Sequence, residues 1–208
     1  MPLRVFTRAL FVVLLFLLVA CEGVPGSGSR ESTVKIPSGN KSAMVDEAQL
    51  SAQDQAATQR GVAALNAENF AIAIAEFKAL SLSNPKLAMP YINLAIAYRG
   101  QKDTDAAMRS VVQALVLSPN SPEAHNLQGV LWRDYGEFIK ARDSYAKALG
   151  ANDEWPDAQL NLGILCDLYL QDLACAKKYY EKYMSLSDVE DRKVKGWLLE
   201  LERRMKKK

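Results

Sequence analysis

The feature that most constrains this chain is an internal repeat with a period of 34 residues, as between positions 61, 95 and 129. In each unit an alanine is followed four positions later by a larger apolar residue, and a small residue precedes both. Each unit's set consists of the small residue, the alanine, the larger residue and a fourth residue that follows the pattern, which is proline in two of the units. The sets are Gly61, Ala73, Phe77 and Pro85; Ala95, Ala107, Val111 and Pro119; and Gly129, Ala141, Tyr145 and Asp153. Separate columns that keep one period over three units predict a stacked-repeat protein.

The physical chemistry of such a unit is that of a helix–turn–helix pair. The small residues allow two helices to approach each other closely, and the large residues fill the space between neighbouring units. One unit alone would leave an apolar face exposed to water, so stability must come from stacking. We therefore expect an all-α solenoid.

The pattern resembles the tetratricopeptide repeat (TPR) family. The second unit carries most of the family's marker residues: Tyr91, Leu94, Ala95, Tyr98, Ala107, Ala114 and Pro119. The resemblance implies a right-handed superhelical solenoid of four helix pairs within residues 49–187, at about 54–87, 88–121, 122–155 and 156–187. In the fourth unit the small residue of the second helix, Ala176, comes one position late. We therefore expect one extra residue in the turn of that unit.

A capping helix and a basic tail are expected at residues 188–208. Ser187 and Glu190 have the spacing of a capping box, which predicts a helix start. The residues predicted for the apolar face of this helix are Val194, Trp197, Leu198, Leu201 and Met205. The basic run 203–208 is either a solvated helix end, which suits the helix dipole, or a contact for anionic lipid or wall polymers.

The N-terminus is typical of an export signal. Two arginines precede twelve apolar residues, Ala9 to Ala20, a stretch too short to span a bilayer. The ending Leu18 to Cys21 resembles the lipobox of bacterial lipoproteins, which implies cleavage after residue 20 and acylation of Cys21 with chains such as palmitate. Glu22 then favours the outer membrane. An ordinary signal peptide or an uncleaved anchor is the alternative.

Residues 21–48 are rich in Gly, Ser, Pro and charge, with no apolar period, and predict a flexible tether. The whole chain has 26 basic and 24 acidic residues and a single histidine, His125. This balance argues against a nucleic-acid binder, and the shortage of histidine argues against most catalytic and metal sites. We expect no enzyme activity, no cofactor and no metal, and we interpret His125 as a packing residue.

Cys166 and Cys175 lie almost symmetrically about the predicted turn of the fourth unit. This places them opposite each other on antiparallel helices, where a disulfide is feasible in an oxidising compartment. The alternative is a pair of buried thiols that behave as small apolar residues.

The resemblance also implies that certain columns of the first helices face the inside of the curve. They are Ile92, Ile96 and Arg99; Asn126, Val130, Arg133 and Asp134; and Ile164 and Asp167. Apolar residues with a few charges suit a protein partner, either a peptide or a helix. The family's site for chaperone tails needs Lys and Asn where this chain has Thr58 and Val62, so we do not expect that partner.

Together these features predict a lipid-anchored scaffold on the outer membrane of a bacterium, facing the periplasm. Similar lipoproteins assist the assembly of pilus or secretin systems. Two alternatives remain open, an accessory of an energised trans-envelope transport system and an adaptor for peptidoglycan hydrolases.

Overall fold

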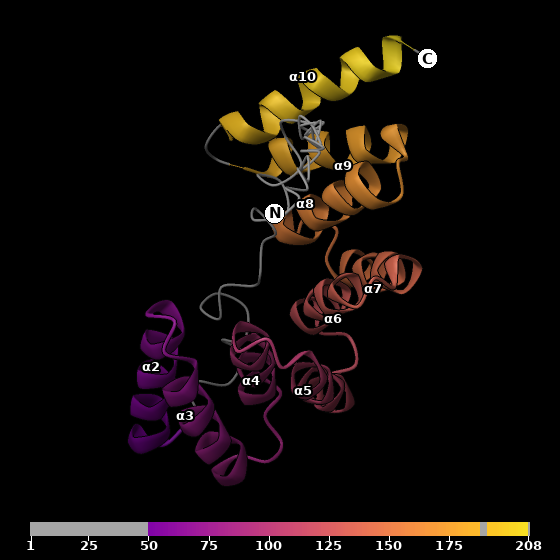
Figure 1. Ribbon diagram of the computed structural model, residues 1–208. Coiled ribbons are helices and arrows are strands. Elements are labelled where there is room, and N and C mark those ends of the chain that lie inside the picture. The colour runs from indigo at the N-terminus through magenta and orange to yellow at the C-terminus, as the bar shows by residue number, and fades with distance from the viewer. Residues whose placement is uncertain (1–49, 188–190, 208) are drawn as a thin grey trace, which may run out of the picture.

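The computed structural model describes residues 50–187 and 191–207. The predicted signal peptide, Cys21 and the tether lie outside them. The described residues form nine α-helices and one π-helical turn, with no strand (Figure 1). They are α2 (Ala52–Asn66), α3 (Phe70–Ser83), α4 (Met89–Gly100), α5 (Thr104–Leu117), α6 (Pro122–Asp134), α7 (Phe138–Ala151), α8 (Pro156–Ile164), η2 (Leu165–Tyr169), α9 (Leu173–Leu186) and α10 (Arg192–Lys206).

The helices pack in sequence order. α2 pairs with α3, α4 with α5, α6 with α7, and α8 with α9, while α10 packs on α9. Consecutive pairs also contact each other, and the first helices α2, α4, α6 and α8 form a contacting row. Figure 1 shows a curved stack with α4, α6 and α8 on its inner side and α5, α7 and α9 on its outer side. The prediction of an all-α solenoid is confirmed.

Each helix pair turns through three residues, and the middle residue has a left-handed backbone. The φ values are 57° at Glu68, 63° at Lys102, 79° at Gly136 and 52° at Gln171. Only one of these four is a glycine, although this conformation costs other residues about 1–2 kcal/mol. Helix packing therefore imposes the turn at Glu68, Lys102 and Gln171.

The extra residue of the fourth unit lies in its first helix and not in the turn, so that prediction is wrong. The turn at residues 170–172 has the same three-residue length as the others. Instead the first helix widens into the π-turn η2, where the Leu170 N–H donates to the Leu165 carbonyl over 3.0 Å. A π-turn accommodates one added residue while its backbone groups stay hydrogen-bonded, which explains the placement.

Each first helix has a small residue where a side chain of its own second helix crosses it. The pairs with a ring are Phe77 on Gly61, Tyr145 on Gly129 and Tyr180 on Gly163, and a Cβ added at the glycine would meet the ring at 2.7, 2.5 and 2.6 Å, respectively. In the second unit Val111 replaces the ring and Ala95 replaces the glycine, and both are buried in one cluster. The two side chains are thus complementary in size in every unit, as a close-packed interior requires.

The last helix starts later than the sequence predicts. The Asp191 carboxylate caps α10 by accepting the N–H groups of Lys193 and Val194, at 3.0 and 3.2 Å. Ser187 instead ends α9, and its hydroxyl donates to the Tyr183 carbonyl over 3.0 Å. The predicted start at Ser187 is therefore wrong, because Asp191 satisfies two N–H groups of the first turn.

The inner face of α10 closes the stack. Val194, Trp197 and Leu201 are buried against the fourth unit. Met205, predicted on the same face, is 39% exposed because it lies near the end of the helix. No helix in the described ranges is long and apolar enough to cross a bilayer.

Candidate partner-binding face

The nine residues expected to face inward lie on three neighbouring first helices. We call them together the first-helix face. Ile92, Ile96 and Arg99 are on α4, four more are on α6, Ile164 ends α8, and Asp167 is in η2. α4, α6 and α8 contact one another in sequence order and lie on the inner side of the curve (Figure 1).

Three charges of the first-helix face form one network. Arg99 on α4 donates to both carboxylate oxygens of Asp134 on α6, at 2.5 Å from Nε and 3.3 Å from Nη2. Arg133 Nη2 donates to the same carboxylate over 3.1 Å. Two guanidinium groups thus share one carboxylate, which leaves one positive charge in excess. The sequence indicated these residues but not that they pair with one another.

The network also contains a buried hydrogen-bond donor without an acceptor. The Arg133 side chain is 3% exposed, and its Nη1 has no partner. On the same helix, seven positions earlier, Asn126 is fully buried. Its Oδ1 accepts from Asn161 over 3.0 Å, but its Nδ2 has no partner either. Seven residues are about two helical turns, so these two residues lie on one side of α6, with their backbone positions roughly 10 Å apart along the helix.

The Tyr145 hydroxyl is a third buried group without a partner near this network. Its ring lies on Gly129, one turn before Arg133. Burial raises the pKa of the Tyr145 phenol well above its ordinary value, and the charge of Arg133 offsets this rise only in part. The hydroxyl therefore stays protonated and can donate at any physiological pH.

The apolar members of the first-helix face are more buried than the sequence suggests. Val130 and Ile164 have no exposed surface and belong to the cluster at units three and four, and Ile92 is 5% exposed. Only Ile96 is partly exposed. This differs from the expectation of an open apolar surface, because these side chains pack in clusters that neighbouring units share.

Asp167 joins the fourth unit to the capping helix. Its carboxylate accepts from Arg204 Nη1 on α10 over 2.6 Å and from the Tyr180 hydroxyl over 3.4 Å. The side chain of Asp167 has no exposed surface. The sequence predicted Asp167 as a contact for the partner. Its actual partner, Arg204, lies 37 positions away, and no local pattern could indicate that the two residues pair.

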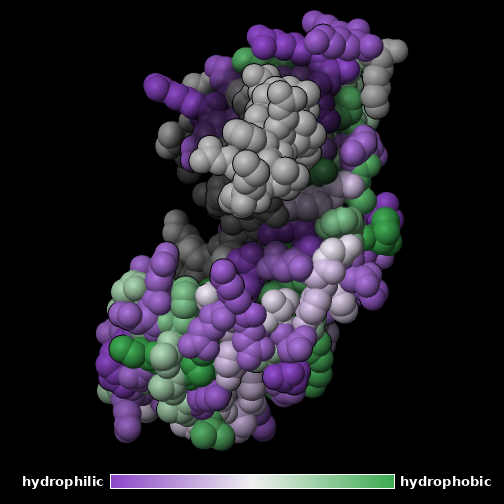
Figure 2. Space-filling model, viewed as in Figure 1, coloured by the Kyte–Doolittle hydropathy of each residue, from purple (hydrophilic) through white to green (hydrophobic). Residues whose placement is uncertain are grey.

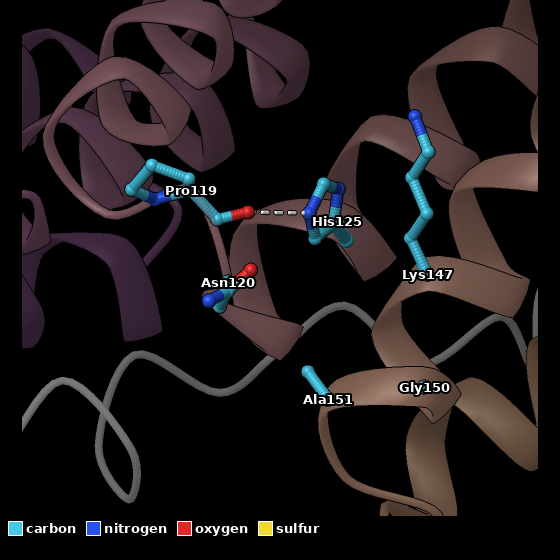
Figure 3. Close-up of a pocket in the computed structure, with 6 residues that line it drawn as sticks. All are labelled: Pro119, Asn120, His125, Lys147, Gly150 and Ala151. Atoms are coloured by element: carbon cyan, nitrogen blue, oxygen red, sulfur yellow. Dashed lines mark hydrogen bonds between the residues drawn. The ribbon is translucent and has the colours of Figure 1, made fainter.

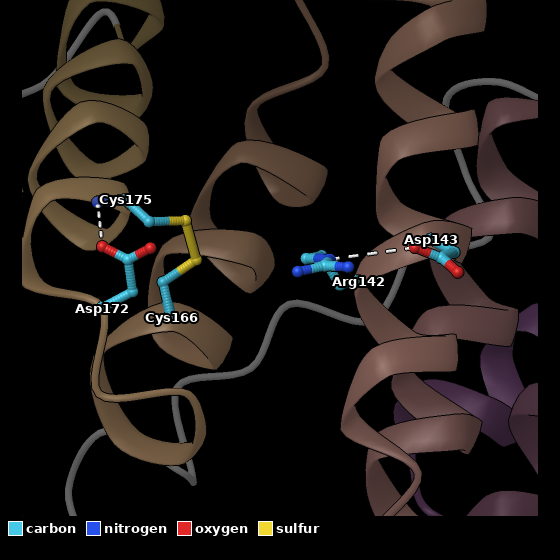
Figure 4. The surroundings of a disulfide bond; sticks show 5 residues. All are labelled: Arg142, Asp143, Cys166, Asp172 and Cys175. Carbon is cyan, nitrogen blue, oxygen red and sulfur yellow. Dashed lines mark hydrogen bonds and ion pairs between the residues drawn. A yellow bond between two sulfur atoms is a disulfide. The ribbon is translucent and has the colours of Figure 1, made fainter.

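The structure joins Cys166 and Cys175 in a disulfide, with their Cα atoms 5.8 Å apart (Figure 4). Cys166 lies in η2, and Cys175 lies in the first turn of α9. The backbone N–H of Cys175 donates to the Asp172 carboxylate, which caps α9, over 3.0 Å. In the third unit the equivalent positions hold Trp132 and Lys140, whose ammonium lies 4.6 Å from the indole centroid. The same two columns thus link the helices of both units.

A hollow of about 670 Å³, which the sequence did not predict, lies beside His125 (Figure 3). It is lined by Pro119, Asn120, His125, Lys147, Gly150 and Ala151. His125 Nε2 donates to the Pro119 carbonyl over 2.8 Å, and its buried Nδ1 has no partner among the residues that the structure describes. The lining contains no carboxylate, thiol or hydroxyl side chain, and its polar side chains are Asn120, His125 and Lys147.

Within the part of the chain that the structure describes, no group of three or more His, Cys, Asp or Glu residues could hold a metal ion. The first-helix face therefore contains two buried donors without an acceptor, an excess positive charge and one partly exposed isoleucine. Such a set can bind and orient another molecule.

Comparison with known proteins places the fold among repeat solenoids. No protein-family model matches the chain, and no curated protein matches it. Among solved structures, pilF of Pseudomonas aeruginosa has a TM-score of 0.67 at 20% identity, covering 74% of this chain and 69% of that chain. A thermophilic TPR protein of Thermus thermophilus has a TM-score of 0.60 at 22% identity, covering 71% of this chain and 80% of that chain. MamA has 0.57 at 23%, covering 74% and 88%. This chain has the tetratricopeptide-repeat fold.

Proposed function

We propose that this chain is a non-enzymatic scaffold that binds a protein partner on its first-helix face. A lipid on Cys21 would hold it to the outer membrane, facing the periplasm. There it would assist the assembly of an envelope complex such as a pilus or secretin system. The membrane role is supported by the resemblance of residues 18–21 to a lipobox, and the assembly role by the likeness to repeat lipoproteins.

The observation that carries partner binding is the pair of buried donors on α6. Leaving a buried donor without an acceptor costs about 1–3 kcal/mol, so native structures rarely keep one without a reason. Here Asn126 Nδ2 and Arg133 Nη1 both lack an acceptor, on the same side of one helix. Both donors are buried, so a partner segment would have to displace the side chains that cover them; acceptors about three extended residues apart would match the spacing of the two positions along α6.

The charge of the site defines the partner further. Arg99 and Arg133 share the single carboxylate of Asp134, so the excess charge is positive. A partner that offers a carboxylate to Arg133 would form a charge-assisted hydrogen bond, stronger than a neutral one. An apolar side chain next to that acid could contact Ile96. We therefore expect the partner segment to contain an acidic residue close to an apolar one.

Site-specific photocrosslinking in cells tests this function. A crosslinker at Ile96 on the inner side should capture a protein, whereas one at Val112, which is 47% exposed on α5, should not. Arg99→Glu should lower the Ile96 capture about 10-fold, because it places a negative charge where the partner's acid binds. Arg142→Glu, at an arginine that is 49% exposed on α7, is the matched control and should change nothing.

Equal capture from both positions, or Ile96 capture that Arg99→Glu leaves intact, would refute the binding proposal. The anchor is tested separately by Cys21→Ser. This change should move the chain from the membrane fraction to the soluble periplasmic fraction and remove the acyl mass from its N-terminal peptide. An unchanged distribution would show that the chain is held by other means.

A further inference from the structure

The outward face of α10 carries a line of cations that the scaffold function does not use. Four cations and one leucine, all exposed and spaced three or four residues apart, lie along one side of the helix: Arg192, Lys195, Leu199, Arg203 and Lys206. We call this set the α10 basic face. The opposite side of the helix, with Val194, Trp197 and Leu201, packs on the fourth unit. Since α10 is the last element described, this face lies at the outer end of the stack (Figure 1).

The helix dipole favours Arg203 and Lys206, which lie in the last turn of α10, but it disfavours the cations at the start of the helix. Like charges three or four residues apart repel each other. The Asp191 carboxylate caps α10, but the first turn itself has no acidic residue and carries Arg192 and Lys193 near the positive end of the helix dipole. Within the described residues, no ion pair involves Arg192, Arg203 or Lys206. Arg204, which pairs with Asp167, points to the other side. The acids Glu200 and Glu202 flank the line without interrupting it.

An apolar residue stands at the centre of these charges. Leu199 is 53% exposed, with cations before and after it along the face. A cap that only had to be soluble would carry a polar residue at this position. Figure 2 shows the outer side of this end of the molecule as mostly hydrophilic, with few apolar residues.

We propose that the α10 basic face docks on an anionic phospholipid surface. Each cation would lie at the level of the head groups, and Leu199 would enter the edge of the acyl region. A helix with basic residues around an apolar one, lying in the plane of the interface, is typical of peripheral membrane binding. An acidic helix of another protein fits less well, because helix pairing needs a repeated apolar seam and this face has a single leucine.

The test measures the chemical reactivity of lysines in the full chain mixed with vesicles. Acetylation rates are read for each lysine by mass spectrometry, on pure phosphatidylcholine and on vesicles with about one third phosphatidylglycerol. Each cation near an anionic surface contributes roughly a five-fold gain in binding. Lys195 and Lys206 should therefore react at least about 5-fold more slowly on the anionic vesicles. Lys102 and Lys147, exposed elsewhere on the solenoid, should change less than about 2-fold.

Two variants with equal net charge provide the control. Arg192→Glu with Arg203→Glu should abolish the protection of Lys195 and Lys206. Arg60→Glu with Arg142→Glu, at arginines 58% and 49% exposed on other helices, should leave it intact. Circular dichroism of both variants checks that the helices are retained. High salt should remove the protection because it screens the attraction.

Three results would overturn the proposal. They are equal reactivity on both kinds of vesicle, protection that survives the α10 double variant, and protection by soluble polyglutamate that equals or exceeds that of the anionic vesicles. The last would assign the face to an acidic protein. None of these readouts involves the first-helix face, so they are independent of the photocrosslinking result.

Discussion

Substituting Gly129 by alanine tests whether ring-on-glycine packing holds the two helices of a unit together. The added Cβ would lie 2.5 Å from the Tyr145 ring, with two further ring atoms at 2.6 and 3.0 Å. The ring has no exposed surface and is enclosed by the cluster of units three and four, so it has little room to move. The helix itself, by contrast, should favour alanine.

The magnitude follows from two opposing terms. Alanine is better than glycine in a helix interior by about 1 kcal/mol. Overpacking a close-packed core costs about 1–3 kcal/mol, and a clash with an enclosed ring belongs at the upper end. We therefore expect Gly129→Ala to lower the free energy of unfolding by about 2 kcal/mol, roughly a 30-fold shift in the folding equilibrium.

Urea unfolding followed by circular dichroism at 222 nm measures this, with Gly196→Ala as the control. Gly196 lies within α10, and a Cβ there would meet no atom within 4 Å. That variant should gain about 1 kcal/mol, so the two substitutions should differ by about 3 kcal/mol. If both variants were stabilised alike, the ring would not require the glycine and the packing argument would be refuted.

A double-mutant cycle separates the clash from other effects. Tyr145→Val alone should leave a cavity and cost about 3 kcal/mol. Combined with Gly129→Ala it reproduces the Ala95 and Val111 pair of the second unit. The combination should therefore be about 3 kcal/mol more stable than the sum of the single changes predicts, because the clash is removed. Additive effects would contradict the complementarity of the two positions.

Three further predictions use the same unfolding assay. Tyr145→Phe removes a buried hydroxyl without a partner, so stability at pH 7 should stay the same or rise by up to about 1 kcal/mol. Since the pKa of Tyr145 is raised in the folded state, only the unfolded chain loses this proton just above pH ~10. In that range the free energy of unfolding of wild type should therefore fall by about 1.4 kcal/mol more per pH unit than that of the variant. Cys166→Ser with Cys175→Ser should cost about 3 kcal/mol without reductant, and dithiothreitol should destabilise wild type alone; a wild type insensitive to reductant would mean that the thiols are not bonded. Asp191→Ala should cost about 1 kcal/mol by removing the cap of α10, whereas Asp143→Ala, at an exposed position that caps no helix, should change stability by less than about 0.5 kcal/mol.

The candidate face shows where sequence reasoning stopped. Periodicity placed Arg99, Arg133 and Asp134 on the inner columns, but the structure shows that Arg99 and Asp134, 35 positions apart, bond to each other. Such a pairing depends on how far one helix is rotated against the next, which no local pattern records. The two unsatisfied donors on α6 could not be predicted for the same reason, since a missing partner is visible only when all neighbours are in place.

The sequence by itself determined that the chain is a stack of helix pairs, because small and large residues at a period of 34 report contacts within a unit and between adjacent units. It also placed Cys166 opposite Cys175. Only the tertiary structure decided that the added residue widens η2, that Asp191 starts α10 and that Arg204 closes on Asp167. These outcomes depend on competition between alternative partners for the same backbone or charged group, and packing of the whole chain settles that competition.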